Sequence, residues 1–217
     1  GNLSNIDGYV YSVWSNTELT LTPEQLINHE NAQKQEILTD NIVAKFNADN
    51  SAGQKYYGYF TVSNRNMSND MNLYSFEINT VDVSTTSEFN TLARTGTLSG
   101  VSDPTQTIFN LTTDLDFTDI KYNITSGSTF TGLFNGNNHT ISNLKINESG
   151  EKNVNVFFKV SGTVMNVNFD NIEINNTNVK SGNQVGIIGE LQDGYAHNIH
   201  VRNANISSYQ SSGAIVG

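Results

Sequence analysis

The sequence of 217 residues contains no cysteine and only two prolines. Without cysteine the chain cannot form disulfides, bind a metal through thiolates or use a thiol nucleophile. No apolar run approaches 18 residues, the length of a candidate membrane-spanning helix, and the first residues lack a signal-peptide pattern. Nucleotide-binding fingerprints and the Gly-x-Ser-x-Gly hydrolase motif are also missing. These absences exclude several enzyme classes, and any export signal or wall anchor is expected outside this sequence.

Positive charge is scarce. The chain has 11 basic and 21 acidic residues, a formal net charge of −10 at pH 7. Such a surface repels phosphate backbones and anionic lipids, so we expect neither a nucleic-acid partner nor membrane insertion. A cysteine-free composition rich in Asn, Thr and Ser is typical of Gram-positive extracellular proteins. The composition therefore predicts a secreted or cell-surface location.

Asparagine is abundant, with 33 copies. Its side chain bonds to neighbouring backbone and tolerates the left-handed conformation, which suits short strands joined by tight turns. A genome of low GC content would also enrich asparagine, and the sequence does not distinguish the two explanations.

Residues 1–81 do not repeat and are predicted to form a small β-rich domain. Thr22-Pro23-Glu24-Gln25 has the capping box and first-turn proline of a helix that would run to residue 38. The predicted strands are 9–14, 18–21, 42–46 and an antiparallel pair formed by 56–62 and 73–78.

Residues 82–217 carry a repeat. Three apolar phrases are framed by glycine: Gly132-Leu133-Phe134, Val185-Gly186-Ile187-Ile188-Gly189 and Gly213-Ala214-Ile215-Val216-Gly217. A second phrase, Asn-Φ-x-Φ with Φ apolar, occurs as Asn143-Leu144-Lys145-Ile146, Asn166-Val167-Asn168-Phe169 and Asn198-Ile199-His200-Val201. A unit with so few apolar residues on one face cannot bury them alone and must stack on copies of itself.

Stacked units of this size predict a parallel β-helix. We expect the Φ residues to point inward and stack on their equivalents, while Lys145, Asn168 and His200 point outward. The framing glycines are expected at tight corners, where a Cβ would obstruct the turn. The predicted fold class is all-β: a small antiparallel module with a short helix, then a truncated, right-handed parallel β-helix over residues 82–217.

The ends and the wall of this β-helix have predicted features of their own. Asn143, Asn166 and Asn198 are expected to stack at one corner as an amide ladder. A short helix over 84–92 is expected to cap the first coil. Strands over 108–111 and 115–117 are expected to open that coil.

Several phrases resemble a known family. Gly186–Gly189 and Gly213–Gly217 resemble the GLUG motif of bacterial surface proteins. Thr129–Ile141 resembles the F-x-G-x-F-D/N-G-x-x-H-x-I phrase that begins such β-helices, and Leu111–Phe117 resembles the phrase before it. Among Gram-positive secreted proteins, the arrangement is similar to the N-terminal region of immunoglobulin A1 protease-type zinc metalloproteases.

That resemblance implies a virulence-associated hydrolase whose zinc lies in a later catalytic domain. The present segment would then recognise and position a host protein, immunoglobulin A1 or another glycoprotein. Two other hypotheses stay open. One is an adhesin stalk that binds a host glycoprotein, and the other is a carbohydrate-active β-helix enzyme.

Asp114, Asp116 and Asp119 form an acidic cluster with possible chemistry. Paired carboxylates serve glycoside cleavage or calcium binding. The first two aspartates lie in the phrase that precedes the repeat, where capping of turns explains them more simply. We therefore interpret them as structural.

The histidines do not form a metal motif. In His29-Glu30-Asn31-Ala32-Gln33 a glutamine stands where a zincin has its second histidine, so this segment is interpreted as an exposed helix face. His139 is expected to cap a turn. His197 and His200 are expected on opposite faces of a strand, which disfavours a shared metal.

Trp14 and the tyrosines Tyr56, Tyr57 and Tyr59 suit either a recognition patch or the core of a small β-module, and the core is favoured. The sequence thus predicts no catalytic, cofactor-binding or metal-ligating residue in this chain.

Overall fold

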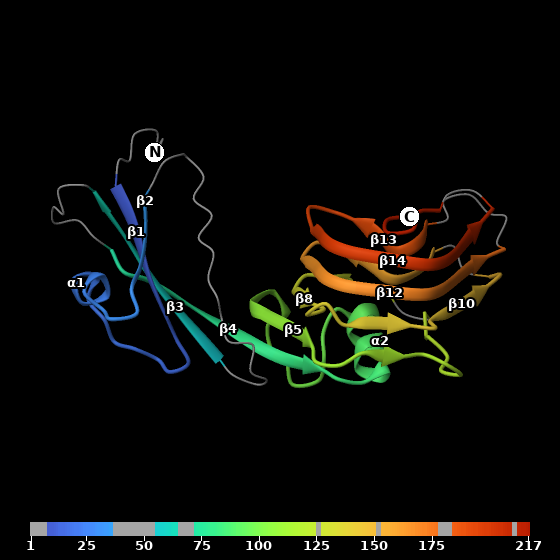
Figure 1. Ribbon diagram of the computed structural model, residues 1–217, viewed down its shortest axis with the longest axis horizontal. Coiled ribbons are helices and arrows are strands. Elements are labelled where there is room, and N and C mark those ends of the chain that lie inside the picture. Colours follow the sequence, from blue (N-terminus) through green and yellow to red (C-terminus); the bar gives the residue numbers. More distant parts are fainter. Residues whose placement is uncertain are drawn as a thin grey trace. The chain divides into compact units, whose positions relative to one another are not determined.

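The computed structural model describes residues 8–36, 55–64, 72–124, 127–150, 153–177, 184–209 and 212–217. The chain divides into two compact units, residues 1–80 and 81–217; the sequence boundary had been drawn one residue later, between 81 and 82. The two units are described separately below (Figure 1).

The first unit is an antiparallel sheet packed against one short helix. Its strands follow the order β2-β1-β3-β4. One face buries Tyr11, Val13 and Tyr59 against Leu26 of the helix. Its elements are β1 (Gly8–Ser15), α1 (Pro23–Ile27), β2 (Gln33–Glu36), β3 (Lys55–Asn64) and β4 (Tyr74–Val83).

Two predictions for this unit are wrong. The capping box of Thr22 and Gln25 forms, but α1 ends at Ile27 because few apolar residues follow to hold a longer helix against the sheet. The chain turns back instead, and β2 pairs with β1. Residues 18–21 form no strand. The Leu19 N–H donates to the Tyr59 hydroxyl at 2.6 Å instead of to the backbone of a neighbouring strand. The strand predicted over 42–46 lies outside the described residues.

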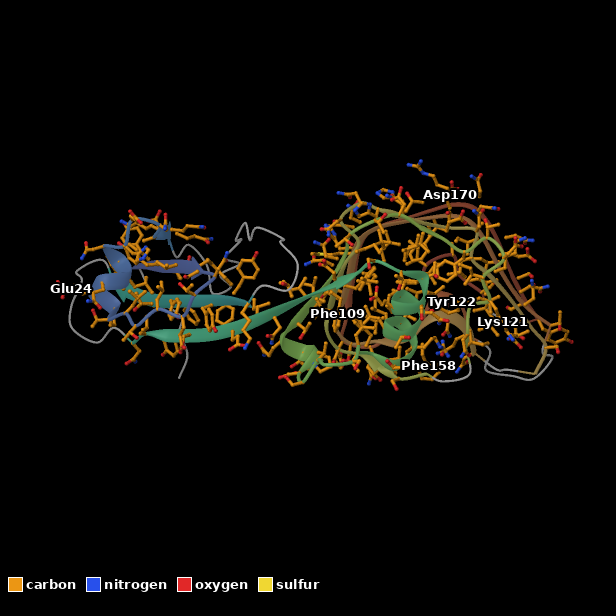
Figure 2. The ribbon with its side chains drawn as sticks, turned by 90° about the horizontal axis from the view of Figure 1, so that it is seen from below. Glu24, Phe109, Lys121, Tyr122, Phe158 and Asp170 are labelled. Carbon is orange, nitrogen blue, oxygen red and sulfur yellow. The ribbon has the colours of Figure 1, made fainter. Side chains whose placement is uncertain are left out.

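The second unit is a parallel β-solenoid of about four turns, which confirms the predicted fold class. Its interior is one continuous apolar cluster, and Figure 2 shows side chains such as Phe109 and Tyr122 filling it. Its strands are β5 (Thr107–Leu111), β6 (Leu115–Asp116), β7 (Thr129–Phe130), β8 (Leu133–Asn135), β9 (Thr140–Ser142), β10 (Lys145–Glu148), β11 (Asn153–Val160), β12 (Thr163–Asn176), β13 (Gln184–Leu191) and β14 (Tyr195–Ser208).

Long strand β12 organises the main wall. It pairs in parallel with β14 on one side and with β8, β9 and β10 on the other (Figure 1). A second sheet has the order β13-β11-β7. Phe169 shows the stacking, because it lies between Ile141 of the coil before and Val201 of the coil after. The predicted inward direction is confirmed for Leu144, Ile146, Val167 and Phe169 by their burial, and Ile199 and Val201 of β14 are partly buried against the same cluster.

The register within the wall differs from the prediction. Leu144 and Ile146 were expected to stack on Val167 and Phe169, but Ile146 pairs with Ile174. Each complete coil of this wall carries two phrases that begin with asparagine, five residues apart, and only one phrase of each coil had been recognised. All of them fit Asn-Φ-x-Φ except the phrase at Asn138, which has His139 in the first Φ position. The three paired phrases begin at Asn138 and Asn143, at Asn166 and Asn171, and at Asn198 and Asn203.

Glycines lie at one corner of the solenoid, but some of the glycines that were expected at corners lie elsewhere. Gly132, Gly162 and Gly194 follow one another from coil to coil between the two sheets. A Cβ on Gly162 would lie 2.0 Å from the carbonyl oxygen of Gly132. Gly186 and Gly189 lie inside β13 instead of at a corner, where a Cβ would meet neighbouring coils.

A helix packs against the solenoid interior. The helix α2 (Thr86–Thr95) starts with a capping box of Thr85 and Glu88 and ends at Gly96 with φ +80°. The ring of Phe89 lies 5.6 Å from that of Phe134 and 5.8 Å from that of Phe157, centroid to centroid. The helix predicted over 84–92 is therefore present and closes apolar surface that the coils leave open. A single 3₁₀ turn (Pro104–Gln106) leads into β5.

Candidate binding wall

Two columns of asparagine run along the outer wall formed by β8 to β10, β12 and β14. In the first ladder, Asn198 Nδ2 donates to Asn166 Oδ1 at 2.9 Å, and Asn166 Nδ2 donates to Asn135 Oδ1 at 3.1 Å. The predicted contact between Asn166 and Asn198 is thus present. Asn143 is not part of it, because its phrase occupies a different position in the coil.

The second ladder contains Asn143. Asn171 Nδ2 donates to Asn143 Oδ1 at 2.6 Å, and Asn143 Nδ2 donates to Asp116 Oδ1 at 2.8 Å. In the next coil, Asn203 Nδ2 donates to Asp170 Oδ1 at 2.7 Å. This ladder joins three successive coils and begins at an aspartate.

The asparagines that open these phrases have left-handed backbones. Their φ angles are +57° at Asn143, +54° at both Asn166 and Asn171, +52° at Asn198 and +48° at Asn203. Asparagine adopts this conformation at lower cost than other side chains with a Cβ. The same residue type therefore bends the strand and supplies the amide that bonds to the next coil. Its abundance here has a structural use.

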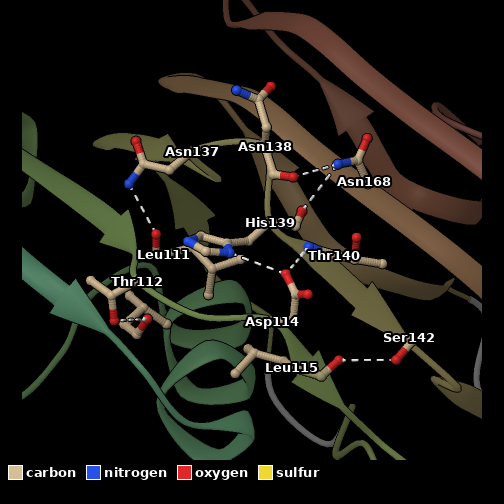
Figure 3. A network of polar contacts seen from close by, with 11 residues as sticks. Leu111, Thr112, Asp114, Leu115, Asn137, Asn138, His139, Thr140, Ser142 and Asn168 are labelled. Atoms are coloured by element: carbon tan, nitrogen blue, oxygen red, sulfur yellow. Dashed lines mark hydrogen bonds and ion pairs between the residues drawn. The ribbon is translucent and has the colours of Figure 1, made fainter.

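Asp114 and His139 meet at the beginning of the wall, as Figure 3 shows. One carboxylate oxygen of Asp114 accepts from the Thr140 N–H at 2.8 Å and lies 3.1 Å from His139 Nδ1. The Thr140 N–H and then His139 hold the pKa of the Asp114 carboxyl below its usual value. Both side chains therefore tie the first coil to the second.

Asp116 is engaged in a similar way. Its Oδ1 accepts from the Asn143 amide, from the Thr118 N–H at 2.9 Å and from the Thr118 hydroxyl at 2.8 Å. These donors, the amide foremost, lower the pKa of its carboxyl. Asp119 has φ +58° in the turn that follows. Asp114 thus bonds to donors of the next coil, and Asp116 bonds to donors of its own turn and of the next coil. These separate sets of donors suit structural carboxylates better than a catalytic pair.

These carboxylates predict how stability depends on pH. A folded pKa below the unfolded value of about 3.9 stabilises the fold at higher pH, and the contribution is lost as pH falls through the folded pKa. We expect the free energy of unfolding to decline below about pH 4. Urea unfolding of the wild type and of Asp114→Asn/Asp116→Asn between pH 2 and 6 checks this. The variant should show a flatter profile, and an equal slope in both would contradict the assignment.

The other histidines are not brought together. His29 follows the short helix, where its Nδ1 accepts from the Asn31 N–H at 3.2 Å, so it lies on a turn and not on a helix face. His197 and His200 are both exposed because the left-handed Asn198 interrupts the alternation between them. Within the described residues, no three His, Asp or Glu side chains are grouped to hold a metal ion.

The aromatic residues of the first unit divide between core and surface. Tyr59 belongs to its core and Tyr56 is buried, as the core interpretation expected. Trp14 is half-buried and contacts Phe76 edge to face, at 5.2 Å between ring centroids.

The structure has a hollow beside the second ladder that was not predicted from the sequence. It has a volume of about 460 Å³. Its rim is the turn closed by the 3.0 Å bond from the Ile120 N–H to the Phe117 carbonyl. Lys121, Lys145 and the two ladder asparagines Asn143 and Asn171 line it. The signal in the sequence that could have predicted it is the five-residue spacing of the paired asparagine phrases, which indicates a second asparagine ladder on this wall.

Comparison with known proteins gives one partial similarity. Over 88 residues, 41% of this chain, the sequence is 32% identical to Halomucin from Haloquadratum walsbyi, and the chain spans only 1% of the length of that relative. No family model matches the chain, and no solved structure matches it significantly. The GLUG and immunoglobulin A1 protease resemblances therefore stay predictions. In the part of the chain that is described, no helix has the length and apolarity to cross a bilayer.

Proposed function

We propose that this chain is a non-catalytic module of an extracellular or cell-surface protein, in which the solenoid is a rigid stem that presents a polar wall to a host glycoprotein. The coil-to-coil bonding of Asn143, Asn171 and Asp116 carries the proposal. It holds polar side chains at fixed spacing on a preorganised surface, and preorganisation lowers the entropic cost of binding.

This proposal has two versions, which differ in the parent protein to which the chain would belong. The GLUG-like phrases support a recognition segment of an immunoglobulin A1 protease-type zinc metallopeptidase, with zinc in a separate catalytic domain. The other version is an adhesin stalk without a protease domain, and the partial similarity to the much longer Halomucin, whose name denotes no protease, is compatible with it. Both versions assign the chain a binding role.

A carbohydrate-active enzyme is a weaker hypothesis. Glycoside hydrolysis needs two carboxylates that flank one bond. Asp114 and Asp116, the strongest candidates, each accept bonds from neighbouring turns. Their pKa values are lowered, which opposes the protonated state that a general acid requires.

Binding and cleavage can be measured on the 217-residue chain. We expect it to bind immobilised immunoglobulin A1 or another mucin-type glycoprotein in surface plasmon resonance. The same preparation should release no fragments from these proteins and no oligosaccharides from polysaccharides. A heat-unfolded sample is the control for non-specific adsorption.

Two results would overturn the proposal. One is cleavage of a polysaccharide that Asp114→Asn/Asp116→Asn abolishes, since it would make the wall an active site. The other is unchanged glycoprotein affinity and cleavage in a parent protein from which residues 82–217 have been deleted.

A further inference from the structure

The hollow beside the second ladder gathers two lysines whose charges are not neutralised by an ion pair. Lys121 and Lys145 line it, both are exposed, and neither makes an ion pair within the described residues. Lys55 and Lys159, by contrast, pair with Glu77 and Glu190. In a protein of net charge −10, two lysines without ion pairs that line one hollow favour an anion there, and a negative group would gain charge-assisted hydrogen bonds. Glu173 is the register partner of Lys145 on β12 but does not line the hollow.

The second ladder supplies neutral polar groups to the same hollow. A primary amide has two N–H donors and an acceptor oxygen. The ladder uses one N–H of Asn143 and one of Asn171, together with Asn143 Oδ1. Within the described residues, the second N–H of each amide and Asn171 Oδ1 make no hydrogen bond. The hollow therefore offers donors and an acceptor at fixed positions, which suits a ligand with several hydroxyl groups.

The size of the hollow and its apolar surface further limit the kind of ligand that fits. The volume of about 460 Å³ is far larger than a single carboxylate needs and lies in the range of small-molecule sites. Ile120 lines the same hollow and is 43% exposed, which gives a sugar ring an apolar contact. Asp119 also lines it, and its carboxylate would repel a second anion but accept a bond from a hydroxyl.

We propose that this hollow binds a saccharide that carries a carboxylate, with Lys121 and Lys145 on the carboxylate and the Asn143 and Asn171 amides on the ring hydroxyls. This inference rests on the proposed recognition function and names the part of a glycoprotein that the wall reads. An acidic peptide is less suitable, because its side chains would leave the amide donors and acceptor without hydroxyl partners.

Titration by NMR tests the site on the isotope-labelled 217-residue chain, with 3′-sialyllactose as the probe. Saturable shifts are expected for the side-chain amides of Asn143 and Asn171. Lys121→Gln and Lys145→Gln should each weaken the affinity about tenfold, the usual weight of a hydrogen bond to a charged group. Lactose, which lacks the carboxylate, should not saturate the site.

Matched controls separate the site from net charge. Lys34→Gln and Lys55→Gln remove the same charge in the first unit and should leave the affinity for 3′-sialyllactose unchanged. Thermal unfolding of each variant confirms that it is folded. The inference is overturned if the two pairs of variants weaken binding equally, if lactose binds as well as 3′-sialyllactose, or if lactose 3′-sulfate or polyglutamate binds more tightly.

The two measurements distinguish a wrong saccharide site from a wrong proposed function. A chain that binds the glycoprotein without responding to 3′-sialyllactose keeps its recognition role and loses this site. A chain that binds neither loses both.

Discussion

Gly162→Ala is expected to lower the free energy of unfolding by about 3 kcal/mol, the upper part of the range for forcing extra atoms into a packed interior. The new Cβ would lie 2.0 Å from the Gly132 carbonyl oxygen and 2.5 Å from the Thr131 carbonyl carbon. Neither is the end of a flexible side chain, so the backbone of the coil must move. The Thr163 N–H to Gly132 carbonyl bond of 2.8 Å joins the coils at this point and would be strained or lost.

Urea unfolding followed by circular dichroism measures this loss. Gly150→Ala is the matched control, because a Cβ at that position has no heavy atom within 4 Å. It should leave the midpoint nearly unchanged. If the two variants unfold at the same urea concentration, the added Cβ does not clash with the Gly132 carbonyl, and the coils are not closely stacked at this corner.

Arg94→Met is expected to lower the free energy of unfolding at least as much, by about 3 kcal/mol or more. Arg94 is only 4% exposed. Its Nη1 donates to the Asn155 side-chain oxygen at 2.8 Å and to the Asn155 carbonyl at 3.1 Å, while Nη2 donates to the Ile124 carbonyl at 2.8 Å. Methionine fills part of the volume but leaves these buried acceptors without their donor. The helix α2 would then lose its polar link to β11.

Two further variants test the cause of this effect. Arg94→Lys keeps the charge but cannot donate in two directions with a planar fork, so it should recover only part of the stability. Arg202→Met removes an exposed arginine and should change the unfolding midpoint little. Wild-type stability in Arg94→Met would contradict the proposed link between helix and solenoid.

The paired phrases explain where sequence reasoning succeeded and where it failed. Asn-Φ-x-Φ predicted inward apolar residues correctly, because the alternation of side chains in a strand is a local property. It did not predict that Asn143 aligns with Asn171 instead of Asn166, because coils of unequal length can be matched in several registers. Backbone pairing across coils decides among them.

The same distinction applies to the candidate binding hollow. Asp114 and Asp116 lie in one short phrase, and their structural role was predicted from that phrase. The contact of Asp114 with His139, which is 25 positions away, was not predicted. Lys121 and Lys145 are 24 positions apart in the chain, and Asn171 belongs to the next coil. No spacing rule relates them, so only coiling of the chain brings them to one hollow.

The order of residues alone thus established an all-β chain with a capping helix and an interior built from stacked apolar phrases, since alternation and helix capping depend on neighbours a few positions away. Three-dimensional packing established which asparagines form each ladder, which glycines stand at the corner and which cations share a surface. Those features depend on contacts between coils, and the energy of such contacts is set by the register of whole strands instead of by any single phrase.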